Sequence, residues 1–275
     1  MKIKTTLLIL LALTALATAQ AFDEENKLSI FEIMQPDGYF GTAFAIEDSV
    51  LGKVLLTCKH VLQDSTGEYF DFVFMRKNRL RTTRQVVSDT SVHTLHLKDK
   101  REKLFIEHPD KNIDLVAILL DQPHKTLRRI EPIIAFDGNL IMDKRALTYI
   151  GIDEGTEVEI VGFSLTTMIP FDNINYHTSR FGKIALYTTD DYSLSIDGER
   201  KTANFLLLDV SIRPGDSGAP IIANIGQRSF FIGVVAALMP DTEFGIGYPS
   251  YYIYDFLMSI RKQQNNRSLQ SHRKN

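Results

Sequence analysis

Short apolar segments with strand character recur along most of this chain, and Gly, Pro, Asp or Asn separates many of them. Such spacing predicts antiparallel β-barrels or sandwiches. The apolar residues of segment 251–260 have helical spacing instead, which predicts a C-terminal helix packed on the second half. We expect strands at residues 28–34, 39–46, 53–58, 69–75, 113–120, 147–150, 156–163, 181–187, 205–208, 220–223 and 230–238.

The length of 275 residues and the hydrophobic content of 44% are enough for a full core. Segment 123–142 contains Pro123, Pro132 and Gly138 and shows little helical period, so we expect it to connect two halves. A polar and aromatic loop is expected at 164–180. The polar, basic end at 263–275 predicts a disordered tail.

The first 21 residues have the three parts of a secretory signal peptide. Lys2 and Lys4 precede an apolar run at 7–13, and small residues follow, with cleavage expected after Ala19 or Ala21. The apolar run is shorter than the roughly 20 residues of a membrane-spanning helix. We therefore expect a secreted or periplasmic protein without membrane insertion after cleavage.

Charge argues against nucleic acid as the main partner. The net charge is −3, and removal of Lys2 and Lys4 makes it more negative. The basic stretch 76–84 is interpreted as a solvated hairpin tip, and His93 and His96 would face opposite sides of a strand. We predict no metal and no cofactor.

The single cysteine, Cys58, excludes an intrachain disulfide. Core packing must therefore hold the fold together. We expect Cys58 to be a small buried residue.

One serine lies on a glycine-rich loop between two apolar segments. Gly215 and Gly218 flank Ser217 and permit backbone angles that a side chain would penalise, so nearby N–H groups can converge on an oxyanion. A serine hydroxyl needs a histidine base. His60 follows a strand end, and Asp114 lies in an apolar run where an ionised carboxylate needs a partner, unless it occupies an exposed strand edge.

These motifs resemble the trypsin-like (chymotrypsin-fold) serine peptidases, especially the disulfide-free bacterial members near the HtrA type. The resemblance covers about residues 28–260, and its chain order is His60, Asp114, Ser217. It implies an all-β fold of two antiparallel six-stranded barrels plus a C-terminal helix. The quoted motifs are 41–44, 55–61, 112–118, 157–163 and 214–220; the domain would span 22–262, with barrels at about 28–122 and 145–248.

The resemblance also implies roles for these residues. Ser217 would be the nucleophile, His60 the base and Asp114 its orienting acid, with the N–H groups of Gly215 and Ser217 as oxyanion hole. The primary substrate pocket would be lined by Ser211 at its base and by Ala236, Ala237 and Leu238 along one wall. The partner would be a protein or peptide substrate with a small or medium apolar P1 side chain.

Several positions depart from the family pattern. Ala219 replaces a second glycine, and Cys58 and Lys59 replace the usual alanines; a cation beside His60 would lower its basicity. No PDZ-like domain follows. Asp216 has no freed Ile or Val amino terminus to pair with, so we expect a partner from the second half.

Two other functions remain open. The same fold could be a catalytically silent binding protein. The same chemistry could serve an esterase-type acyl hydrolase, although the Gly-x-Ser-x-Gly elbow is absent.

Overall fold

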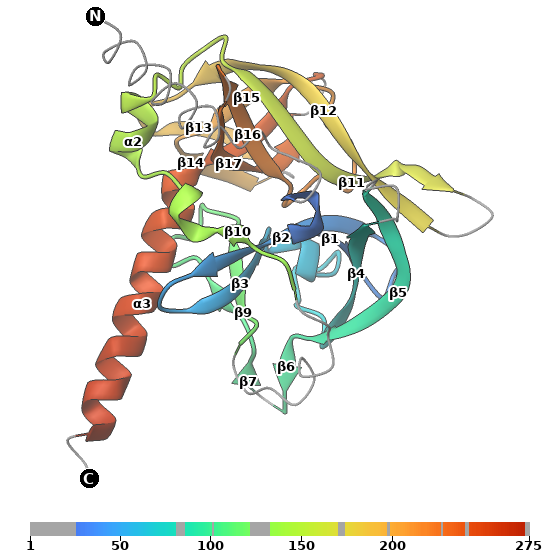
Figure 1. The fold of residues 1–275 in the computed structure, drawn as a ribbon, viewed down its shortest axis with the longest axis vertical. Coiled ribbons are helices and arrows are strands. Elements are labelled where there is room, and N and C mark those ends of the chain that lie inside the picture. The colour runs from blue at the N-terminus through green and yellow to red at the C-terminus, as the bar shows by residue number, and fades with distance from the viewer. Residues whose placement is uncertain are drawn as a thin grey trace, which may run out of the picture.

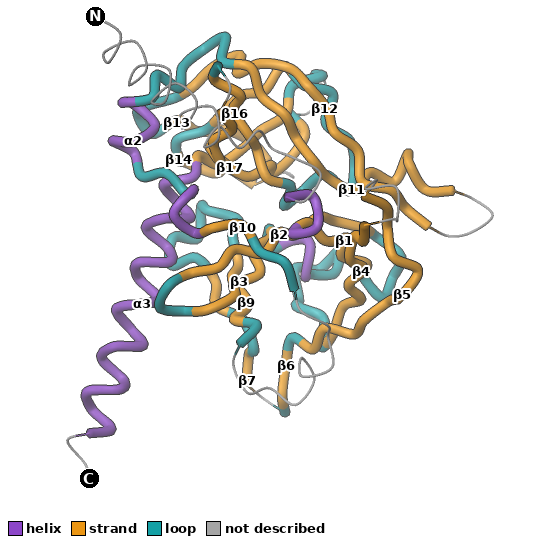
Figure 2. Tube along the Cα trace, viewed as in Figure 1, coloured by secondary structure: helices purple, strands orange, loops and turns teal. Residues whose placement is uncertain are grey.

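The structure is a computed structural model and describes residues 26–80, 86–100, 102–121, 133–169, 174–196, 199–226, 228–239 and 242–272. The predicted signal peptide, 1–21, lies outside the described residues. The chain forms two β-rich halves flanked by one long helix (Figure 1; Figure 2). None of the described helices is long and apolar enough to cross a membrane.

The first half is one sheet in the order β5-β4-β1-β2-β3-β9-β8, with β10 paired to β2. Among the described residues this sheet forms a half-barrel that does not close, whereas the sequence predicts a closed barrel here. After β5 the chain leaves the sheet for the separate β6–β7 pair, and β8 is only two residues long. The strands are β1 (Ile30–Met34), β2 (Phe40–Asp48), β3 (Gly52–Thr57), β4 (Phe72–Leu80), β5 (Val86–His96), β6 (Lys98–Asp99), β7 (Glu102–Lys103), β8 (Ile106–Glu107), β9 (Val116–Leu119) and β10 (Phe136–Asp137).

The second half is a closed barrel in the order β11-β12-β15-β18-β17-β16, which agrees with the predicted six strands. A separate hairpin, β13–β14, is inserted before β15. The strands are β11 (Glu157–Ile169), β12 (Ile174–Tyr187), β13 (Tyr192–Ile196), β14 (Glu199–Ala203), β15 (Leu206–Asp209), β16 (Pro220–Ile225), β17 (Arg228–Leu238) and β18 (Gly245–Pro249).

Two local predictions in the second half are wrong. The predicted strand 147–150 lies mostly in helix α2 (Lys144–Tyr149), because the Asp143 side chain caps the helix by accepting the Ala146 N–H at 2.7 Å. The predicted loop 164–180 is largely β-structure. Strands β11 and β12 continue through it as a hairpin, apart from residues 170–173, which are not described.

Three buried clusters form the core. One fills the first half and includes Phe31 and Leu55, and another fills the second barrel and includes Ile160 and Ile221. The third joins the two halves, for example through Phe44. Short 3-10 turns η1 (Asn26–Ser29), η2 (His60–Leu62) and η4 (Gly138–Leu140) complete the fold.

The C-terminal helix α3 (Ser250–His272) is longer than predicted. Residues 263–272 of the predicted disordered tail are helical, because no Gly or Pro interrupts the segment. Phe256, Leu257 and Ile260 join the cluster shared by both halves. The helix runs from the second half past the first, and its last turns project beyond the sheet (Figure 1).

The predicted solvated basic tip needs a correction at its first residue. Arg76 is only 6% exposed and donates to the buried Glu32 carboxylate at 2.9 Å across the β1–β4 pair. Paired in this way, a buried cation is compatible with the sheet interior. Residues 81–85 of the tip lie outside the described part.

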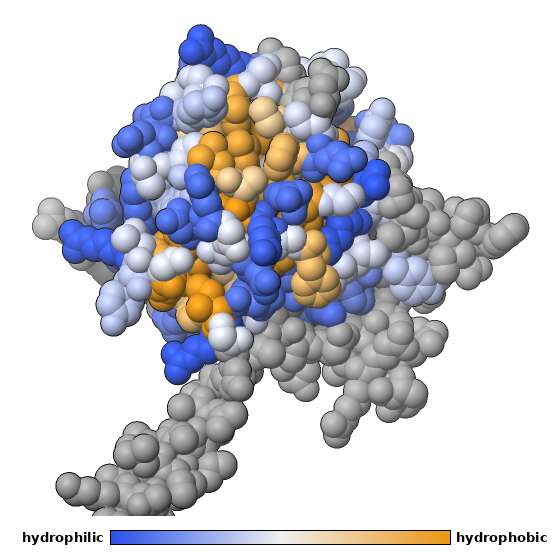
Figure 3. Space-filling model, turned by 90° about the horizontal axis from the view of Figure 1, so that it is seen from above, coloured by the Kyte–Doolittle hydropathy of each residue, from blue (hydrophilic) through white to orange (hydrophobic). Residues whose placement is uncertain are grey.

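Seen from above, the surface is hydrophilic around patches of apolar side chains (Figure 3). Tyr149 and Phe181 are the most exposed large apolar residues of the described chain. Singly exposed apolar residues are normal on soluble surfaces.

An ion pair fastens α3 to the first half. The Arg261 guanidinium donates to both oxygens of the buried Asp48 carboxylate, and its Nη2 lies 2.5 Å from Asp48 Oδ2. Burial raises the pKa of Asp48, but hydrogen bonds from Arg261 and from the Leu51 and Val50 N–H groups outweigh burial and hold the pKa below its ordinary value.

We therefore predict that Arg261→Ala lowers the free energy of unfolding at pH 7 by about 2 kcal/mol, the scale of a hydrogen bond to a charged group. Because the pKa of Asp48 is lowered on folding, this stabilisation is present above its ordinary pKa and disappears as the pH falls through the folded-state value. Urea unfolding at several pH values measures it. The exposed neighbour gives the control Lys262→Ala, and equal effects of the two changes would contradict the prediction.

Candidate active site

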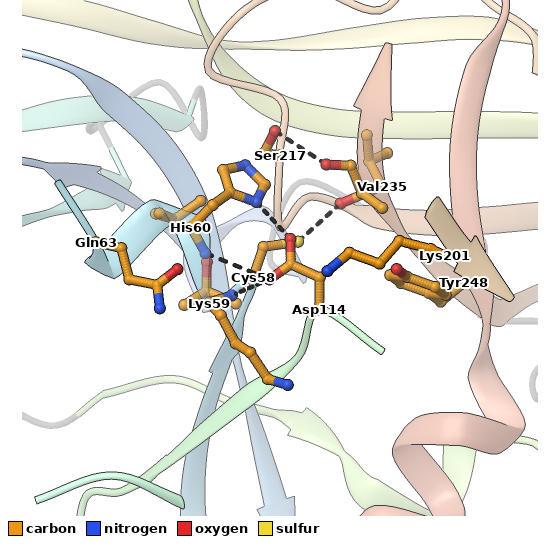
Figure 4. A network of polar contacts seen from close by, with 12 residues as sticks. Cys58, Lys59, His60, Gln63, Asp114, Lys201, Ser217, Val235 and Tyr248 are labelled. Carbon is orange, nitrogen blue, oxygen red and sulfur yellow. Dashed lines mark hydrogen bonds and ion pairs between the residues drawn. The ribbon is translucent and has the colours of Figure 1, made fainter. Parts of the chain in front are cut away.

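The structure brings His60, Asp114 and Ser217 together between the two halves (Figure 4). His60 begins η2 just after β3, and Asp114 directly precedes the buried Leu115 and β9. Ser217 lies on the loop between β15 and β16 of the barrel. In Figure 4, Asp114 and Ser217 lie on different sides of the His60 imidazole.

Asp114 holds His60 through side chain and backbone. The His60 Nδ1 lies 2.5 Å from Asp114 Oδ2, while Oδ1 accepts the Lys59 N–H at 2.7 Å and the His60 N–H at 3.3 Å. Burial raises the pKa of Asp114, but the charge and hydrogen bonds of His60 and the Lys59 N–H outweigh it and hold the pKa below its ordinary range. The carboxylate is therefore ionised at neutral pH, and the exposed-edge alternative does not apply.

The glycines of the Ser217 loop are required by space as well as by conformation. Gly215 has φ +99°, and a Cβ there would lie 2.1 Å from the Phe163 carbonyl oxygen. Gly218 has φ +86°, and a Cβ there would lie 2.0 Å from the Thr42 carbonyl oxygen. Ala219, in contrast, is fully buried, so its methyl group is accommodated.

The loop leaves two N–H groups available. Among the described residues, the N–H groups of Gly215 and Ser217 donate no hydrogen bond to a protein atom. The Ser217 hydroxyl donates to the Ala236 carbonyl at 3.3 Å, next to a register shift in the β17–β18 pairing. The two N–H groups could bind a carbonyl oxygen that acquires negative charge.

Thr42 of β2 ties the Ser217 loop to the first half. Its N–H donates to the Ser217 carbonyl at 2.8 Å, and its hydroxyl donates to the Gly215 carbonyl at 2.7 Å. The same hydroxyl accepts the Phe163 N–H at 2.9 Å. The sequence alone does not assign this role to Thr42, although a threonine inside the apolar run 39–46 is a signal for it.

Asp216 is fully buried, and its expected partner in the second half is Arg180 of β12. The Arg180 Nη1 lies 2.6 Å from Asp216 Oδ1, and the Arg213 N–H donates to Oδ2 at 2.7 Å. Burial raises the pKa of Asp216, and the Arg180 charge opposes that rise. This ion pair holds the loop from inside the barrel.

Two further contacts fix the Asp114 segment against the second half. The buried Tyr248 hydroxyl donates to the Asn112 carbonyl at 2.9 Å, and the Thr202 N–H donates to the Asn112 side chain at 3.4 Å. Burial raises the pKa of Tyr248, so the phenol stays protonated and remains a donor.

The two unusual residues before His60 differ in burial. Cys58 is fully buried, as expected, and its thiol donates to the Val235 carbonyl at 3.3 Å. Lys59 is half-buried, and burial lowers the pKa of its ammonium group. The Lys59 side chain extends away from the imidazole (Figure 4). Together with His60 and Asp114, Cys58 forms the one group of possible metal ligands found in the described chain.

The predicted pocket residues lie near the Ser217 loop in sequence or on β17. Ser211 is exposed, Ala236 and Ala237 are buried, and Leu238 is 43% exposed. Ile212, which the sequence patterns do not single out, is buried against β18. A Cβ on Gly245 would lie 2.3 Å from Ile212 Cγ1, so isoleucine fills the space beside that glycine.

Comparison with known proteins gave only structural matches. No family model matches the chain, and no curated protein matches it. A Mycobacterium tuberculosis protease, Rv3671c in its active form, is 16% identical at a TM-score of 0.48, covering 85% of this chain and 81% of its own. A thermostable serine protease, AL20 from an extremophilic microorganism, is 12% identical at a TM-score of 0.48, covering 85% of this chain and 99% of its own.

The Arg180–Asp216 pair leads to a stability prediction. Arg180→Met would leave the buried carboxylate without its cation, which costs about 3–5 kcal/mol of unfolding free energy. Urea unfolding at pH 7 measures the loss. Lys183→Met, an exposed change on the same strand, is the matched control.

Adding Asp216→Asn to Arg180→Met removes the unpaired charge and should recover part of the stability. Equal stability of the single and the double variant would show that the charge pair does not hold the loop.

Proposed function

We propose that this protein is a serine endopeptidase that cleaves peptide bonds through Ser217, His60 and Asp114. The observation that carries this proposal is the 2.5 Å contact by which Asp114 orients His60, with Ser217 beside the same imidazole (Figure 4). An ionised carboxylate on Nδ1 keeps the proton there and leaves Nε2 as the basic nitrogen.

In the first step, the Ser217 hydroxyl turns from the Ala236 carbonyl to Nε2 of His60. As the oxygen attacks the substrate carbonyl carbon, its proton passes to Nε2. Asp114 stabilises the resulting imidazolium. The negative charge on the carbonyl oxygen is bound by the N–H groups of Gly215 and Ser217.

In the second step, the imidazolium protonates the departing amine and leaves an acyl group on Ser217. Water then attacks the ester, again with His60 as base, and restores the hydroxyl. These steps need no cofactor. Substrates would be proteins or peptides, and the predicted signal peptide would place the reaction in the periplasm or outside the cell.

The two alternatives differ in simple assays. A silent binding protein would not react with a fluorophosphonate at Ser217, whereas both hydrolases would. Matched peptide and ester substrates then distinguish a peptidase from an esterase. The proposal requires fluorophosphonate labelling that Ser217→Ala abolishes, together with cleavage of an internal peptide bond.

We predict that Ser217→Ala and His60→Ala each lower kcat on the order of 10⁶-fold, because either change disables one cooperating unit. For the same reason the double variant should be no slower than either single variant. Single-turnover peptide hydrolysis measures these rates, and circular dichroism verifies the fold. Substantial peptidase activity in Ser217→Ala would show that another group is the nucleophile.

We propose that the residues of the predicted substrate pocket set the selectivity. Ser211 offers no negative charge to a basic side chain, and Ile212 occupies the space beside Gly245. We predict that small apolar P1 residues are cleaved faster than Phe, Arg or Lys. Ile212→Ala should raise the rate for Phe relative to Ala at P1 by at least about 10-fold, the scale of one methylene group.

A P1 peptide library measures this ratio. Ile221→Ala is the matched control, because Ile221 belongs to the same buried cluster and lies against Gly247 of the same strand, but it is on β16 and not next to Ser211. A strong native preference for Arg or Lys, or the same shift in Ile221→Ala, would contradict the prediction.

A further inference from the structure

Cys58 supplies a third ligand atom next to the His60–Asp114 pair. One sulfur, one ring nitrogen and one carboxylate oxygen lie within 4.8 Å of one another. Figure 4 shows the Cys58 sulfur beside the Asp114 carboxylate. Cys58 is fully buried, but the His60 side chain is 38% exposed and the Asp114 side chain 20% exposed. The cluster is therefore closed behind the sulfur and accessible from the imidazole.

We propose that these three residues form an inhibitory site for a thiophilic divalent cation such as Zn²⁺. Thiolate, imidazole and carboxylate are the ligands that zinc takes in proteins, and three protein ligands leave a fourth position for water. Cys58 is essential to the proposed site, because His60 and Asp114 alone offer only two ligands. The binding itself needs no catalysis, whereas its inhibitory effect rests on the proposed function.

A bound ion must separate the His60 imidazole from the Asp114 carboxylate. His60 Nδ1 and Asp114 Oδ2 are 2.5 Å apart, too close for two ligands of one ion. With zinc bonds of about 2.0–2.2 Å to nitrogen and oxygen, the pair must open by roughly 1 Å. The ion would then occupy the place of the proton that joins the two groups.

Metal binding moves one proton on His60 and releases another from Cys58. The Nδ1 proton is lost from that nitrogen and Nε2 becomes protonated, so the imidazole stays neutral. The Cys58 thiol loses its proton to solvent and becomes the thiolate ligand, which releases one proton for each ion bound. Binding should therefore strengthen as the pH rises.

The protonated Nε2 explains the expected inhibition. This nitrogen can no longer accept the proton of the Ser217 hydroxyl, and Asp114 no longer orients the base. Two cations lie near the proposed site and would oppose the binding of a positive ion. The Lys201 ammonium group, however, is paired with Glu199, and the Lys59 side chain extends away from the imidazole (Figure 4).

The test measures metal binding apart from turnover. Zn²⁺ is titrated by calorimetry into the mature chain carrying Ser217→Ala, with and without Cys58→Ser or Cys58→Ala, and Mg²⁺ serves as control ion. We expect one Zn²⁺ per chain, and an affinity loss on removing the sulfur that exceeds the roughly 10- to 100-fold typical of changes to residues that only hydrogen-bond a metal ligand. Co²⁺ should give a thiolate charge-transfer absorption that disappears in both Cys58 variants.

Hydrolysis is measured separately as the ratio of rates with and without Zn²⁺. In the chain with native Ser217, Zn²⁺ should stop hydrolysis reversibly, and Cys58→Ser should require at least about 100-fold more Zn²⁺. Equal Zn²⁺ affinity without Cys58, or no cobalt–thiolate absorption, would overturn the site. Saturation with Zn²⁺ without slower hydrolysis would overturn the inhibition. If no peptide is cleaved but Cys58-dependent binding persists, the proposed function fails and the metal site stands.

Discussion

The hydrogen bonds of Thr42 are the constraint on which the arrangement of the site depends. One residue of the first sheet contacts the carbonyl groups of Gly215 and Ser217, and Thr57 donates to the Thr42 carbonyl at 2.7 Å. Each bond contributes only about 1 kcal/mol net, but leaving these buried groups unpaired would cost more. The loop that carries Ser217 is thereby positioned relative to the sheet that carries His60.

Local sequence signals predicted helices and strands well where contacts within one segment determine its structure. Five of the six barrel strands coincide with predicted apolar runs, but β18 was not predicted. The apolar segment 147–150 is mostly helical because the Asp143 side chain caps α2. The hairpin formed by β11 and β12 was missed for a different reason. Polar residues can occupy strands when a neighbouring strand completes their hydrogen bonds, and that neighbour is not visible in a sequence window.

The same distinction between local signals and contacts with neighbouring strands applies to the residues of the candidate site. Ser217 was recognisable from adjacent glycines, and Asp114 from its improbable place in an apolar run. Arg180 and Ile212 were not identified, because their roles depend on which strands become neighbours in the closed barrel. The burial of Arg76 was missed for the same reason, since its partner Glu32 lies on another strand. The sequence therefore indicated the reactive side chains better than the residues that hold those side chains in place.

Helix α3 has a consequence for the order in which the protein can mature. Phe256 and Ile260 complete a cluster that both halves share, and Arg261 neutralises Asp48 from the same helix. During synthesis these residues leave the ribosome after both β-rich halves. The junction that contains His60 and Ser217 can therefore reach its final packing only after α3 has emerged, so a shorter nascent fragment would carry the reactive side chains without the assembled geometry.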